Sequence, residues 1–211
     1  MSEKQYGNNA LVVYAVRPTP IEKEVVWNKN ETLLSKIDPA GLIEYANDAF
    51  MDVSGFEDYE LINQAHTINQ HPDMPKAIDN LIWENLRAGN KFHAVVKNLA
   101  KSGRYYWVWA DYDIVRNNYG EITHYFVREK AVSSEVVYKH IEPLYKRLLN
   151  IERTSGVSAS EKYLNGFWEE TERDYLAYLQ YVVIDTTPKI VEPELKQEIK
   201  KRSSFLNLFT F

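Results

Sequence analysis

Three segments of strand length follow one another between residues 92 and 128, and they constrain the fold more than any other feature of the sequence. Phe92 to Leu99, Tyr105 to Val115 and Ile122 to Arg128 are rich in β-branched and aromatic residues. The connections between them contain "KSGR" and "NNYGE", which are short and carry glycine, as hairpin turns do. The segments therefore predict three consecutive antiparallel strands.

The residues before these strands add two more strands and two helices. "TLLSKIDPAGLIEYA" predicts two short strands around the turn Asp38 to Gly41. "NDAFMDVSGF" predicts a short helix with Asn47 or Asp48 as its cap. Residues 75 to 88 predict a longer helix that ends at Gly89 and has one apolar face. The order β-β-α-α-β-β-β predicts an α+β fold, an antiparallel sheet of about five strands with helices on one face.

The rest of the chain flanks this unit. We expect an N-terminal extension over 1–30, the α+β domain over 31–132, a connecting helix over 133–152 and a C-terminal helical segment with a tail over 153–211. Proline should start or kink the connecting helix at Pro143. Ser158 and Glu161 have the spacing of a capping box. A stripe at helical spacing follows, made of Leu164, Trp168, Tyr175, Leu179 and Val182.

Composition excludes several classes of protein. The 211 residues contain 45% hydrophobic residues and 28 aromatic ones, enough for a packed core, and the net charge of -5 gives no reason to expect nucleic-acid binding. No cysteine is present, so disulfides, thiolate metal sites and cysteine nucleophiles are excluded. The longest apolar run, Ala10 to Val16, is too short to span a membrane, and the first residues do not read as a signal peptide. We expect a cytoplasmic protein without a transmembrane segment.

Enzyme motifs are scarce. No dinucleotide fingerprint, P-loop, H-E-x-x-H or G-x-S-x-G occurs. The five histidines show no metal-ligand spacing with carboxylates. The sequence therefore predicts neither a metal site nor an enzyme.

Three stretches carry a resemblance to a known family. "IEYANDAFMDVSGF", "HPDMPKA" and "VVKNLAKSGRYYWV" together resemble a PAS domain, and specifically the aerotaxis-receptor type, in which the sensor domain binds FAD. "IEPLYKRL" is similar to the helix that follows the PAS core in that family. The resemblance covers roughly residues 31 to 150. It implies a PAS fold and an FAD-based redox sensor of the energy-taxis kind.

Strand alternation supplies a physical test of a flavin site. Because residues i and i+2 share a face, Asn98 and Tyr106 should point inward among small apolar neighbours, while Trp107 and Trp109 point outward. An amide and a phenol beside apolar side chains suit the polar edge and the flat faces of a heteroaromatic ring. Asn47 matches a pocket asparagine of the family, and Trp83 is a further candidate flavin contact.

The stretch "HPDMP" has a structural and a functional interpretation. Asp73 should cap the helix that begins near Met74, with Pro75 in the first turn. The same turn would present His71 and Asp73 at the mouth of the pocket, near a helix N-terminus that favours an anionic group. The sequence departs from the family at Gln70, where the family carries arginine, and this removes a fixed partner for a phosphate.

Several functions stay open. The leading one is a stand-alone flavin sensor that signals by protein contacts to a separate membrane chemoreceptor. The alternatives are a haem or small-ligand PAS sensor and a cofactor-free PAS module for dimerisation or scaffolding. A homodimer could form through the outer sheet face around Trp107, unless the extension or the helix from Glu135 covers it. The basic and aromatic tail after Glu194 is either a weak membrane anchor or a segment packed on the body.

Overall fold

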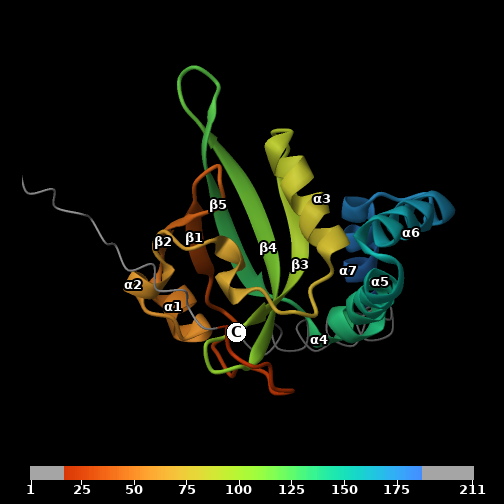
Figure 1. Cartoon of the computed structure of the whole chain (residues 1–211), viewed down its shortest axis with the longest axis horizontal. Helices are drawn as coiled ribbons and strands as arrows, with labels where there is room; N and C mark the ends of the chain where they lie inside the picture. The colour runs from red at the N-terminus through yellow and green to blue at the C-terminus, as the bar shows by residue number, and fades with distance from the viewer. Residues whose placement is uncertain (1–16, 187–211) are drawn as a thin grey trace, which may run out of the picture.

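A five-stranded antiparallel sheet forms the centre of the computed structural model, which describes residues 17–186. The strands run in the order β2-β1-β5-β4-β3 (Figure 1). The predicted hairpins are confirmed, and the last strand continues past Arg128. The strands are β1 (Leu33–Ile37), β2 (Ile43–Ala46), β3 (Phe92–Leu99), β4 (Tyr105–Arg116) and β5 (Ile122–Ala131).

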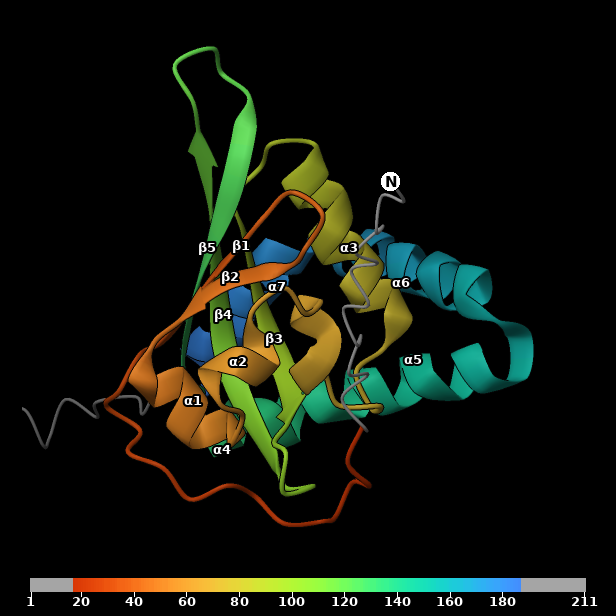
Figure 2. The same ribbon diagram turned by 60° about the vertical axis from the view of Figure 1, so that its left-hand side comes forward.

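Four helical segments between β2 and β3 cover one face of the sheet, which we call the inner face (Figure 2). The turn before β2 forms as predicted, since Leu42 N–H donates to Asp38 Oδ1 at 2.8 Å. Asn47 caps the first helix by accepting a hydrogen bond from Phe50 N–H at 3.0 Å, which confirms the predicted cap. The segments are α1 (Asp48–Ser54), α2 (Asp58–Leu61), the 3₁₀ helix η1 (His66–Asn69) and α3 (Lys76–Arg87).

Five further helical segments follow the sheet and gather beside the β3 edge (Figure 1). Trp107 points to the outer face, as predicted, and is only 8% exposed because Tyr145 packs on it with ring centroids 6.0 Å apart. Pro143 is the second residue of its helix, as predicted. The segments are α4 (Ser134–Val136), the π-helical η2 (Val137–Ile141), α5 (Glu142–Ser155), α6 (Val157–Thr171) and α7 (Tyr175–Thr186).

Along the free edge of β3, backbone groups of Val95 and Lys97 form hydrogen bonds with other segments. Tyr145 Oη donates to the carbonyl of Val95 at 2.6 Å, and Val95 N–H donates to Tyr175 Oη at 3.4 Å. Two residues further along, the carbonyl of Lys97 accepts from His71 N–H at 3.1 Å. Helices α5 and α7 and the loop before α3 are therefore fastened to the same edge strand.

Two predicted helix caps are wrong. Asp73 does not cap α3, because the helix begins at Lys76 and the Asp73 carboxylate pairs with Lys97 at 3.0 Å. Ser158 does not cap α6, because that helix begins at Val157, directly after Gly156. The predicted apolar stripe is largely buried but belongs to two helices, since the chain turns between Thr171 and Tyr175. The tail lies outside the described residues.

Within residues 17–186, no helix is both long enough and apolar enough to cross a bilayer.

Candidate functional site

A chain of buried polar side chains lies on the inner face of the sheet. The register places Asn98 of β3 opposite Tyr106 of β4, and both are at most 2% exposed. Asn98 Nδ2 donates to Glu129 Oε1 on β5 at 3.1 Å. Asn69, from η1, donates through Nδ2 to Tyr106 Oη at 3.1 Å. Burial raises the pKa of the Tyr106 phenol well above its usual value, and the Glu129 charge raises it further, so the phenol stays protonated.

Glu129, like Asn69, belongs to this polar group but is not among the residues predicted from the sequence. Its side chain is 1% exposed, and its Oε2 has no hydrogen-bond partner. Burial raises its pKa to about 7, although the hydrogen bond from Asn98 lowers it in part. A signal existed, because Tyr125, Val127 and Glu129 alternate along one strand. The predicted strand ends at Arg128, whereas β5 continues to Ala131, so Glu129 lies outside the predicted sheet.

The inner face and α3 enclose a small cavity of about 30 Å³ beside this chain. Two predicted site residues, Trp83 and Asn98, line it. The Trp83 ring meets Tyr125 edge-on, with centroids 6.1 Å apart, and also packs on the glycine turn at Gly41. The other lining residues are His66, Thr67, Asn69, Gln70, Met74, Asp79, Ile82, Val96 and Tyr112.

His66 forms the end of the cavity next to α1. Its Nε2 lies 3.1 Å from Ser35 Oγ, and its ring lies near Phe50. Burial lowers the pKa of His66 to about 4, so the imidazole is neutral at pH 7. In the described part of the chain, no group of three or more His, Asp or Glu side chains is placed to bind a metal ion.

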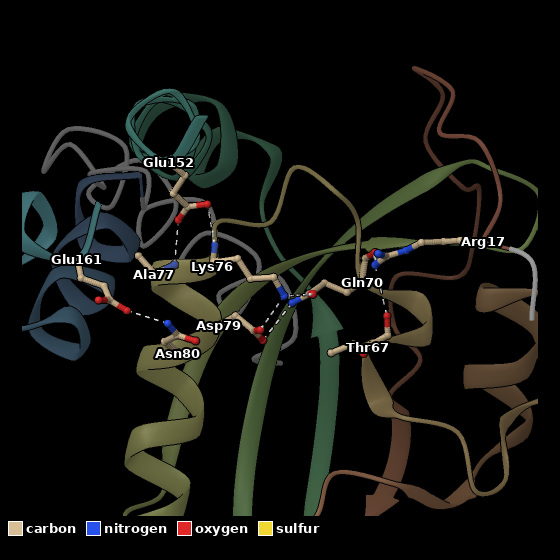
Figure 3. A network of polar contacts seen from close by, with 9 residues as sticks. All are labelled: Arg17, Thr67, Gln70, Lys76, Ala77, Asp79, Asn80, Glu152 and Glu161. Carbon is tan, nitrogen blue, oxygen red and sulfur yellow. Dashed lines mark hydrogen bonds and ion pairs between the residues drawn. The ribbon is translucent and has the colours of Figure 1, made fainter. Parts of the chain in front are cut away.

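The rim of the cavity is a polar network that joins three parts of the chain (Figure 3). Gln70 Nε2 donates to Asp79 Oδ1 of α3 at 3.1 Å, and Lys76 pairs with the same carboxylate at 3.2 Å. Arg17, from the N-terminal extension, donates through Nη2 to the carbonyl of Gln70 at 2.6 Å. The Arg17 guanidinium therefore contacts the backbone of Gln70, the residue that stands where the resembled family carries arginine.

The remaining predicted site residues lie away from the cavity. The Asn47 amide is engaged by backbone groups: Oδ1 accepts from Leu34 N–H at 2.9 Å, and Nδ2 donates to Thr32 O at 3.0 Å. His71 and Asp73 lie together where the loop before α3 meets the outer face. His71 Nδ1 accepts from Asp73 N–H at 3.0 Å, and burial, with the nearby Lys97 charge, lowers the pKa of His71 to about 4.

A larger groove of about 320 Å³ opens beside Asp73 on the outer face. The buried Lys97 and the rings of Trp107 and Tyr145 lie at its base. Its charged groups are paired among themselves, with Lys97 on Asp73 at 3.0 Å and Lys146 on Glu142 at 3.2 Å. The structure thus separates the predicted residues into an inner group around Asn98 and an outer group around His71.

The inner group has the chemistry that a flavin ring requires but not the volume. The amides of Asn69 and Asn98 could meet the polar edge of the ring, and Trp83 and Val96 could meet its flat face. Glu129, behind Asn98, has one oxygen without a hydrogen-bond partner. Pockets for ligands of this size enclose roughly 300 Å³ or more. About 30 Å³ holds a water molecule, so a flavin could enter only if α3 or the segment before it moved outward.

The comparisons with known proteins agree with this architecture. The sequence model of the PAS fold matches residues 43–126. Over 126 residues, 59% of this chain, the sequence is 42% identical to the aerotaxis receptor of Escherichia coli strain K12. It is 30% identical over 88 residues, 41% of this chain, to the biofilm dispersion protein BdlA of Pseudomonas aeruginosa. It is 29% identical over 100 residues, 47% of this chain, to the nitrogen fixation regulatory protein of Klebsiella pneumoniae.

The aligned regions cover 24%, 21% and 20% of these three relatives, so each relative contains much that this chain does not match. A solved light-oxygen-voltage domain aligns at 21% identity over 59% of this chain and 88% of its own length, with a TM-score of 0.46, which is too weak to bear on function. The sequence match and the five-stranded sheet with helices on its inner face agree. The chain therefore contains a PAS domain, and its sequence is similar to that of an aerotaxis receptor.

Proposed function

We propose that this PAS domain is the input domain of a redox sensor and that it binds FAD non-covalently at the inner-face cavity. One observation carries the proposal: on the inner face of its sheet, this relative of an aerotaxis receptor has a row of buried polar side chains that ends in an unpartnered carboxyl oxygen. A buried polar atom without a hydrogen-bond partner costs stability and is rarely retained without a reason. A hydrogen-bonding group of a ligand placed beside Glu129 would satisfy Oε2.

Different residues around the cavity would bind different parts of the flavin. Trp83, Val96 and Ile82 offer the walls for the ring, and Asn98 and Asn69 offer hydrogen-bonding groups for its polar edge. Arg17 brings a cation to the rim, near enough to Gln70 to serve a phosphate group. When bound, FAD would supply the redox chemistry. Asn98 could respond to a change of protonation on it, because an amide presents either a donor or an acceptor when it rotates.

This protein would transmit the signal through protein contacts in the cytoplasm, and the proposed signalling partner is a separate membrane protein of the chemoreceptor type. The similarity to the aerotaxis receptor supports a sensory signalling role. The helices α4 to α7, which follow the sheet, are the surface such a partner would meet, and self-association through them stays a further possibility of the same proposal.

The absorbance spectrum of the full-length protein tests the proposal. We expect the two flavin bands, in the blue and near-ultraviolet, either as purified or after incubation with FAD. A Soret band would instead identify a haem sensor. Protein that stays colourless after refolding with excess FAD would contradict the proposal. It would support the second candidate, a cofactor-free interaction module, which the 30 Å³ cavity favours.

A further inference from the structure

The first turn of α3 obtains its cap from a distant helix. Pro75, the residue before the helix, supplies no side-chain cap, so the first N–H groups of α3 need another acceptor. Glu152 of α5 provides it: Oε2 accepts from Lys76 N–H at 3.1 Å and Oε1 from Ala77 N–H at 2.9 Å. A carboxylate at this position also complements the positive end of the helix dipole. Figure 3 shows both hydrogen bonds.

A second carboxylate holds the same helix one turn further on. Glu161 of α6 accepts a hydrogen bond from Asn80 Nδ2 at 2.7 Å (Figure 3). Helices α5 and α6 are consecutive and joined at Gly156, so the two glutamates belong to one helical hairpin. The hairpin therefore forms hydrogen bonds with α3 through two glutamates, and neither glutamate lines the cavity.

The helix held in this way is the wall of the cavity. Asp79, Ile82 and Trp83 of α3 line the cavity directly. Asp79 also holds Gln70, so the rim moves with the helix. With both glutamate contacts made, the cavity measures about 30 Å³. Any ligand with several rings must displace α3 or the rim, and displacement of α3 acts directly against the Glu152 cap.

We propose that Glu152 is a positioning residue for the inner-face cavity: by capping α3 it holds the cavity closed, and entry of a ligand weakens the hold of the α5–α6 hairpin on α3. The part of this that concerns FAD rests on the proposed function. Because coupling between two equilibria is reciprocal, loss of the cap must favour ligand entry by the same factor by which the ligand loosens the hairpin. Glu152 thus links the occupancy of the cavity to the helices that follow the PAS core.

The test titrates FAD into full-length protein and compares wild type with Glu152→Ala, Glu152→Gln and Glu142→Ala. Removal of a helix cap should tighten FAD binding by about fivefold. Glu152→Gln keeps one acceptor oxygen and should give a smaller change in the same direction. Glu142→Ala removes the same charge from the same helix, where Glu142 pairs only along α5 with Lys146, and should leave the Kd unchanged. A Kd for FAD that is unchanged or higher in Glu152→Ala than in wild type would overturn the proposal.

A second measurement, without ligand, keeps the two proposals separable. Amide hydrogen exchange of the apo protein should become faster in Glu152→Ala both in the first turn of α3 and in α6, since one of the two glutamates that form hydrogen bonds between the hairpin and α3 is lost. Faster exchange in α3 alone would show a local cap and would overturn the coupling. If no form binds FAD but exchange rises in both elements, the proposed function fails while the link between α3 and the hairpin stands.

Discussion

Asn98 on β3 reaches diagonally over β4 to donate a hydrogen bond to Glu129 on β5 at 3.1 Å. The contact satisfies one oxygen of the carboxyl and leaves the other without a partner. Because both residues are at least 98% buried, the pair lies in an environment where a charge is costly and a proton is retained.

The first prediction concerns the pH dependence of stability. The pKa of Glu129 is raised to about 7 in the folded protein, so between pH 4.5 and pH 7 the folded state holds a proton that the unfolded state releases. The free energy of unfolding should therefore fall as pH rises through this window. Glu129→Gln removes the cost and should stabilise the protein by about 3 kcal/mol at pH 8 and by almost nothing at pH 4. Urea denaturation at a series of pH values measures it. Glu84→Gln, on an exposed site of α3, should keep the wild-type profile.

The second prediction concerns Gly41 and Trp83. Gly41 has φ +87°, and a Cβ added there would lie 2.8 Å from Trp83 Cη2. Gly41→Ala should destabilise the protein by backbone strain of about 1–2 kcal/mol and also by displacing the indole from the cavity wall. Gly120 is the matched control, because its φ is +83° and no atom lies within 4 Å of an added Cβ. Thermal unfolding should show a larger loss at Gly41 than at Gly120. Equal losses would mean that Trp83 adapts without cost.

The third prediction tests Arg17. If its guanidinium serves the phosphates of FAD, Arg17→Ala should weaken FAD binding by about tenfold, the order expected for a lost charge-assisted hydrogen bond. Riboflavin has no phosphate, so its affinity should not change. Fluorescence titration with both ligands measures the difference. An equal loss for FAD and riboflavin would show that Arg17 acts only by fixing Gln70, whose carbonyl it contacts at 2.6 Å.

The fourth prediction concerns Tyr145. Its hydroxyl donates to the carbonyl of Val95 at 2.6 Å and lies 3.1 Å from Tyr175 Oη. Tyr145→Phe leaves a buried carbonyl without a donor and should cost about 1–3 kcal/mol in the free energy of unfolding. Amide exchange along β3 should rise as well. Tyr119→Phe, at a side chain that is 89% exposed, should change neither quantity. A neutral Tyr145→Phe would show that water replaces the phenol.

Local patterns were enough to predict most of the sheet and the separation of its faces. Alternation along β3 and β4 correctly placed Asn98 and Tyr106 inside and Trp107 outside, because each strand has one face on the core. The Asn47 cap could also be predicted, because the donor Phe50 N–H and the acceptor Asn47 Oδ1 belong to residues only three positions apart in the sequence.

Contacts between distant parts of the chain could not be predicted in this way. The sequence predicts Asp73 as the cap of α3, but the Asp73 carboxylate forms an ion pair with Lys97, 24 residues further along the chain. The helix is capped instead by Glu152, which is 76 residues from Lys76. A capping pattern in a sequence identifies only acceptors that are close in the sequence to the first N–H groups of the helix. The position of His71 and Asp73 away from the cavity could not be predicted either, because it depends on a long-range contact between their loop and the edge of β3.

The two tyrosines and the loop on the edge of β3 also decide how a partner can be recognised. An uncovered edge strand offers a row of N–H and C=O groups to any extended peptide, and this is a common route both to peptide capture by strand addition and to aggregation. Here the hydroxyls of Tyr145 and Tyr175 occupy the groups of Val95, and the backbone of His71 occupies the carbonyl of Lys97. At Val95 both main-chain groups are already engaged, and so is the carbonyl of Lys97, so strand addition by a partner is blocked there and recognition at this part of the edge depends on side-chain shape and charge.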